Sequence, residues 1–106
     1  MFYLKILLLS FIPALMFGQG YYAAEGSNSF YQLLLNDNKT FSYTEQSPIG
    51  KITVSITGSY SYVSNVQIKA SGRDTRNNTS QQIIISLRGK YAELSIYGQK
   101  RSLTKR

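Results

Sequence analysis

The sequence lacks cysteine, histidine and tryptophan among its 106 residues, and it contains only 2 prolines. Without thiol or imidazole groups it can form no disulfide framework, no cysteine or histidine zinc site and no histidine-based catalytic site. Acidic residues are also few, with 5 Asp and Glu against 12 Lys and Arg, so the formal net charge is +7. A chain of this length holds one domain. We therefore expect a small basic protein that is not an enzyme and that uses no cofactor or metal.

The first twenty residues differ in composition from the rest of the chain. An apolar run from Ile6 to Phe17 follows Lys5 and ends at small and polar residues. This pattern is typical of a secretory signal peptide with a helical apolar core, and the run is shorter than the roughly 20 residues of a membrane-spanning helix. We expect cleavage of the segment 1–20 after Gly20 or, as an alternative, after Gln19. No cysteine follows the run, so lipoprotein attachment is excluded.

The expected mature protein is an exported, periplasmic or extracellular domain with no transmembrane span. Removing residues 1–20 takes away one cation, Lys5, and no acid, so 11 cations and 5 acids remain and the net charge is +6. We interpret 21–29 as a flexible N-terminal segment and 30–104 as a single β-barrel-like domain. An exported domain without disulfides depends on its core and its hydrogen bonds for stability.

Strict alternation between Lys51 and Tyr62 is the clearest periodic signal in the chain. Even positions carry apolar or aromatic residues and Gly58, whereas odd positions carry Lys, Thr and Ser. Alternation with a period of two predicts a strand with one buried and one solvated face. Because a straight strand of this length is too long for so small a domain, we expect Gly58 to mark a bend or a bulge.

Shorter segments of the same character predict the other strands. They are Phe30–Leu35, Thr40–Thr44, Val66–Ala70, Gln81–Leu87, Tyr91–Tyr97 and a piece around Leu103. Turn-forming residues separate them, and only Ser71–Ser80 is expected to be a long loop. The sequence predicts an all-β fold, an antiparallel meander of six to seven strands curled into a barrel or half-barrel. The expected core residues are Leu33, Leu35, Phe41, Tyr43, Ile52, Val54, Ile56, Val66, Ile68, Ile83, Ile85, Leu87, Leu94 and Ile96.

Three pieces of this pattern resemble small secreted lipocalin-like proteins, which are common in the Bacteroidetes. They are the strand, turn and aromatic strand from Leu33 to Tyr43, the Gly58-Ser59-Tyr60 strand leading to Val66–Ser71, and the closing hairpin from Leu94 to Thr104. The resemblance implies a short up-and-down β-barrel or half-barrel. Larger lipocalins carry a Gly-x-Trp motif and a ligand cavity, whereas this chain has no tryptophan. Since eight strands are about the minimum that encloses one small ligand, we expect side chains to fill a barrel of six or seven strands.

The candidate binding residues are tyrosines and cations. Aromatic rings can stack on sugars or bases while nearby cations meet phosphate or uronate groups, although strand tyrosines also pack against a core and scattered cations also serve solubility. The candidates are Tyr60, Tyr62, Arg73, Arg76, Arg88 and Lys90. We interpret the protein as a secreted, non-enzymatic lipocalin-like binding or interaction module. Its expected partner is an anionic envelope component, a small ligand or another protein.

Other functions remain open at this stage. One alternative is an OB-like barrel that binds oligosaccharide or single-stranded nucleic acid, although export argues against an intracellular nucleic acid. Another is a secreted inhibitor or immunity protein. A paired-acid enzyme would need Asp74 and Glu93 to lie close together.

Overall fold

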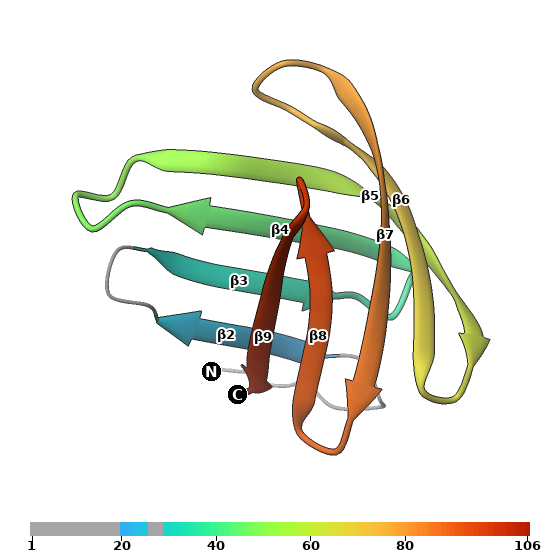
Figure 1. Cartoon of the computed structure of the whole chain (residues 1–106). Helices are drawn as coiled ribbons and strands as arrows, with labels where there is room; N and C mark the ends of the chain where they lie inside the picture. The colour runs from blue at the N-terminus through green and yellow to red at the C-terminus, as the bar shows by residue number, and fades with distance from the viewer. Residues whose placement is uncertain (1–19, 26–28) are drawn as a thin grey trace, which may run out of the picture.

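The computed structural model describes residues 20–25 and 29–106, which form an all-β closed barrel of eight antiparallel strands (Figure 1). The strands are β2 (Gly20–Glu25), β3 (Phe30–Leu35), β4 (Thr40–Gln46), β5 (Ile52–Ser64), β6 (Gln67–Asp74), β7 (Thr79–Arg88), β8 (Tyr91–Ile96) and β9 (Gln99–Lys105). Each strand pairs with the next along the chain, and β2 pairs with β9 to close the barrel. The predicted all-β meander is confirmed, whereas the predicted count of six or seven strands is wrong.

The additional strand is β2, which lies within the segment expected to be flexible. Its six residues pair with β3 from Gly20 opposite Leu35 to Glu25 opposite Phe30, and Tyr22 and Ala23 also pair with β9. Residues 21–25 of the segment expected to be flexible therefore form part of a strand. Of the predicted signal peptide 1–20 and its helix, residues 1–19 lie outside the described part of the chain, as do residues 26–28.

The expected loop Ser71–Ser80 is instead a hairpin. β6 continues to Asp74 and β7 starts at Thr79, with Arg73 opposite Ser80 and Asp74 opposite Thr79, so only a short turn remains. Asn78 takes a left-handed conformation in that turn, with φ of 59°. Asparagine tolerates this conformation better than most residues, which is a local reason for the tight turn.

Gly58 allows β5 and β6 to approach closely where the barrel bends. Figure 1 shows β5 running beside β4 and then turning to run beside β6. Gly58 lies opposite Gly72, and a Cβ atom built on Gly58 would fall 2.5 Å from the Gly72 Cα atom. A glycine pair therefore accounts for the close approach at this point, where the register is unbroken. The register shifts of β5 lie elsewhere, between Tyr62 and Ser64 in its pairing with β6 and opposite Glu45 and Gln46 in its pairing with β4.

The barrel interior is filled by one cluster of buried hydrophobic side chains. Eleven of the fourteen predicted core residues are buried, whereas Ile52 and Val66 are exposed and Leu87 is half-buried against the cluster. Ile52 is the first residue of β5 and Val66 lies in the turn before β6, so neither side chain packs inside the barrel. The cluster also contains residues outside the predicted set, namely Tyr22, Tyr60, Ala70, Ala92 and Leu103.

Candidate functional site

An open pocket lies at one end of the barrel, which we call the basic end. This end carries the turns at 36–39, 65–66 and 89–90, together with the end of β9. The mouth pocket has a volume of about 520 Å³, within the range typical of small-molecule sites. It is lined by Tyr22, Tyr62, Ser64, Asn65, Val66, Leu87, Gly89 and Lys105. The barrel thus brings together residues that are far apart in the sequence.

The lining combines an apolar surface with two tyrosines. Val66 is 55% exposed and Leu87 packs against the core cluster, so both offer aliphatic surface at the mouth. Tyr22 is buried in the wall, and its burial raises the pKa of its hydroxyl, with a further contribution from the neighbouring Tyr62. The Tyr22 phenol therefore remains neutral near pH 7, where it can donate or accept a hydrogen bond.

Lys105 reaches the pocket across Gly20. A Cβ atom on Gly20 would lie 3.1 Å from Lys105 Cε, so the glycine leaves the space in which the lysine stem lies. β9 is fixed here because the Lys105 amide donates a 2.7 Å hydrogen bond to the Lys90 carbonyl. A cation is thus held at the edge of an apolar pocket.

Lys39 lies over a pair of tyrosine rings at the same end. Its Nζ atom is 5.6 Å from the Tyr60 ring centroid and 5.2 Å from that of Tyr62, within cation–π distance. The two rings are edge to face with centroids 6.1 Å apart. Tyr60 is buried and its hydroxyl donates to the Asn36 carbonyl at 2.7 Å, so Tyr60 supports this arrangement from beneath.

The basic end carries more cations than acids. The cations are Lys39, Arg88, Lys90, Lys105 and Arg106, and the acids are Asp37 and Glu93. Glu93 forms an exposed 2.6 Å ion pair with Arg88 across the β7–β8 hairpin, and Lys90 Nζ lies 5.7 Å from the Tyr91 ring centroid. The local excess of positive charge favours an anionic ligand.

The six predicted site residues are divided between the two ends. Tyr62 lines the mouth pocket, Tyr60 supports it, and Arg88 and Lys90 flank Gly89 in its rim. Arg73 and Arg76 belong to the β6–β7 hairpin at the opposite end, where Arg73 donates to the Asn78 carbonyl at 3.1 Å. The barrel therefore brings four of the six candidate residues to the basic end and leaves Arg73 and Arg76 at the other end.

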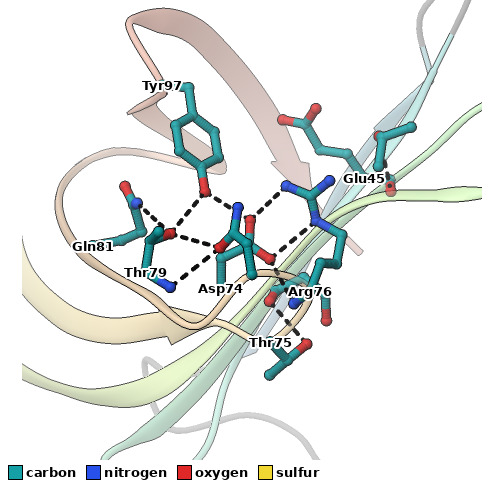
Figure 2. Close-up of polar contacts among 10 residues, drawn as sticks. Glu45, Asp74, Thr75, Arg76, Thr79, Gln81 and Tyr97 are labelled. Carbon is teal, nitrogen blue, oxygen red and sulfur yellow. Dashed lines mark hydrogen bonds and ion pairs between the residues drawn. The ribbon is translucent and has the colours of Figure 1, made fainter.

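A polar cluster holds the β6–β7 hairpin to the tip of the β8–β9 hairpin (Figure 2). The buried Asp74 carboxylate accepts hydrogen bonds from Arg76 Nε at 3.0 Å, Arg76 Nη2 at 2.6 Å and the Tyr97 hydroxyl at 2.7 Å. The Arg76 guanidinium holds the pKa of this carboxyl well below its usual range, although burial acts in the other direction. Because its oxygens are all engaged, Asp74 acts here as a structural link.

A second buried ion pair lies between β4 and β9. Arg101 Nε donates to Glu45 Oε2 at 3.0 Å, and the Tyr43 hydroxyl donates to the same oxygen at 2.6 Å. The Arg101 guanidinium also lies 4.6 Å from the Tyr31 ring centroid.

Asp74 and Glu93 are held by different arginines, Arg76 and Arg88, so no paired-acid site is built from them.

Several residues of the mouth pocket were missed from the sequence. Tyr22 belongs to a strand that was not expected, and Lys105 lies in the basic C-terminal segment beyond the predicted domain 30–104. Leu87 was assigned to the core. The order of the turns could have indicated this end of the barrel. In an antiparallel meander successive turns lie at alternate ends, so the turns at 36–39, 65–66 and 89–90 lie together.

Neither metal sites nor helical membrane spans are found over residues 20–25 and 29–106. This part of the chain has no group of three or more His, Cys, Asp or Glu side chains that could hold a metal ion. It also contains no helix long and apolar enough to cross a membrane. Comparison with protein-family models, curated proteins and solved structures finds no match, so the interpretation rests on this chain's own residues.

Proposed function

We propose that this protein is an exported, non-enzymatic, lipocalin-like module that binds a small amphipathic anion in the mouth pocket. The observation that carries the proposal is an open pocket of about 520 Å³ with aliphatic and tyrosine walls beneath a cationic rim. Such a site suits a ligand with an apolar body and one anionic group.

Two parts of the lining take different parts of the ligand. The apolar body lies against Val66, Leu87 and Tyr62, and each 100 Å² of apolar surface removed from water contributes about 2.5 kcal/mol. The anionic group lies beside Lys105, with Lys39 and Lys90 at the rim. A cation about 4 Å from an anion near a protein surface contributes about 1 to 4 kcal/mol, depending on the local dielectric.

The architecture supports the lipocalin-like part of the proposal. Eight antiparallel strands in meander order, closed by pairing of the first with the last, are the arrangement of up-and-down barrels such as lipocalins. The buried cluster occupies the interior, so the ligand lies at the mouth rather than along the barrel axis. An OB-fold is a five-stranded Greek key barrel, so the eight-strand meander does not favour the OB-like alternative.

The start of β2 fits both expected cleavage positions. Its ladder begins with Gly20 opposite Leu35, so cleavage after Gln19 leaves the whole strand and cleavage after Gly20 removes one residue of it. The barrel that remains carries the proposed site in either form. A periplasmic or extracellular location places this site where it meets envelope components or excreted small molecules.

A matched pair of probes tests the proposal. We expect 1-anilinonaphthalene-8-sulfonate to bind the mature protein at least fivefold more tightly than N-phenyl-1-naphthylamine, which has the same rings without the sulfonate. The preference should decrease at high salt, because the rim cations are exposed to screening. Equal binding of both probes would contradict the anionic part, and binding of neither would reject the proposal.

Variants locate the site. Lys105→Gln should weaken sulfonate binding about fivefold, whereas Lys69→Gln on the outer face of β6 should not change it. Val66→Ser should weaken both probes, whereas Val63→Ser in the same hairpin, outside the pocket lining, should weaken neither. An equal effect of the two members of either pair would place the binding elsewhere.

A further inference from the structure

The ladder between β7 and β8 is incomplete. Its pairs are Ser86 with Glu93, Leu87 with Ala92 and Arg88 with Tyr91, although β7 has 10 residues and β8 has 6. If this register continued toward the β8–β9 hairpin, at what we call the upper end, Ile84 would lie opposite Ser95. The ladder does not contain this pair. The two strands therefore separate beyond Ser86, whereas β7 remains paired with β6 and β8 with β9 on their other edges.

The direction of the neighbouring hydrogen bonds shows which backbone groups face this opening. The Leu87 amide donates to the Val66 carbonyl, so the backbone polar groups of Leu87 face the β6 side. Successive residues of a strand direct these groups to opposite sides, so the N–H and C=O groups of Ile84 face β8. The Lys105 amide donates to the Lys90 carbonyl, and by the same alternation Ser95 turns its N–H and C=O toward β7. Strand polar groups thus face the opening from both sides.

Side chains bound the opening and make it a slot. The Ser86–Glu93 pair closes its lower end, and the Tyr97 hydroxyl spans its upper end with contacts of 2.7 Å to Asp74 and 3.4 Å to Thr79. The wall slot has a volume of about 450 Å³. It is lined by Ile84, Ser86, Glu93, Leu94, Ser95, Lys100, Arg101 and Ser102.

We propose that the wall slot binds a short extended peptide segment of a partner protein, with an acidic side chain beside Lys100. An extended chain is the ligand whose alternating N–H and C=O groups match those of Ile84 on one edge and Ser95 on the other. Ile84 is 47% exposed and offers an apolar contact on the outer face. The inference goes beyond the proposed function, because it concerns a different surface and a different class of ligand.

Charge sets the expected sequence and orientation of the peptide. Lys100 lies opposite Ser95 in the β8–β9 ladder, and no carboxylate of the described residues forms an ion pair with it. Glu93 lies at the lower end, where it disfavours a second acid. The segment should therefore carry its acidic residue near the upper end of the wall slot.

Amide hydrogen exchange, followed by NMR, tests the wall slot and the peptide together. In the free protein the Ile84 and Ser95 amides should exchange at least tenfold faster than those of Ile85 and Leu94, whose amides face paired strands. A blocked pentapeptide of alternating threonine and valine with a central glutamate should slow exchange at Ile84 and Ser95. Equal protection of all four amides in the free protein would overturn the proposal, and so would fast exchange unchanged by the peptide.

Matched variants and peptides separate this site from others. Ile84→Lys should abolish binding of the pentapeptide, whereas Ile52→Lys, at an isoleucine of similar exposure on β5, should leave it unchanged. Lys100→Glu should weaken binding about fivefold or more, and Lys51→Glu, at an exposed lysine outside the slot lining, should not. A pentapeptide with N-methylated valines should not bind. Equal effects within either variant pair, or undiminished binding of the methylated peptide, would overturn the proposal.

Discussion

Replacing Glu45 with Ala leaves the Arg101 guanidinium in the barrel wall without its carboxylate. The side chains of Glu45 and Arg101 are 7% and 19% exposed, so water replaces the lost partner poorly. Removing one member of a buried ion pair costs about 3 to 5 kcal/mol, and the Tyr43 hydroxyl also loses its acceptor at 2.6 Å. Because the Tyr31 ring still lies against the guanidinium, we expect the lower part of this range, about 3 kcal/mol.

Urea unfolding followed by far-ultraviolet circular dichroism measures this loss. A decrease of about 3 kcal/mol corresponds to a fall in Tm of roughly 12 to 24 °C for a domain of this size. The double variant Glu45→Leu with Arg101→Met should cost much less than Glu45→Ala, because apolar residues replace a buried pair with little penalty. A loss below about 1 kcal/mol for Glu45→Ala, or a double variant as unstable as the single one, would refute the reasoning.

Three further perturbations test other parts of the fold by the same unfolding assay. Gly58→Ala should cost about 3 kcal/mol or more, because its Cβ would collide with the Gly72 backbone, while the exposed Ser59→Ala should cost little; equal costs would contradict the close approach. Asp74 has a lowered pKa, so the stability that it contributes is present above the unfolded pKa near 4 and decreases as the pH falls toward the folded pKa. Asp74→Asn should therefore flatten the dependence of the unfolding free energy on pH below pH 4. An unchanged dependence would contradict the ion pair. Burial, with the hydrogen bond to the Glu45 carboxylate, raises the pKa of Tyr43. The stability that Tyr43 contributes is therefore present below about pH 10 and decreases above it. Tyr43→Phe should reduce this loss of stability at alkaline pH, and an unchanged loss would contradict the raised pKa.

The strands with strict alternation could be predicted from the sequence because one face of each strand packs against the single core and the other face meets water. Phe30–Leu35 is predicted with its observed bounds, and the Lys51–Tyr62 alternation corresponds closely to β5. Alternation loses its meaning where both faces of a strand meet water. At the ends of β6 and β7 the alternating apolar residues also give way to polar residues and Gly72, and the buried position is taken by Asp74, so Ser71–Ser80 is interpreted from its sequence as a loop.

Features that depend on contacts between distant strands could not be predicted. β2 is short and rich in alanine, and it is stabilised by partners on both edges, β3 and β9. Glu45 and Arg101 are 56 residues apart, and only closure of the barrel brings them together. The mouth pocket arises in the same way, because β2, β5, β7 and β9 each contribute part of its lining.

Titration of the mature protein with 1-anilinonaphthalene-8-sulfonate, followed by amide NMR shifts, tests the proposed binding site most directly. The account predicts saturable shifts centred on Tyr62, Val66, Leu87 and Lys105, with the Ser95 region of the wall slot unchanged. Shifts centred on the β6–β7 hairpin or spread over the outer faces of the strands would contradict a ligand site at the basic end.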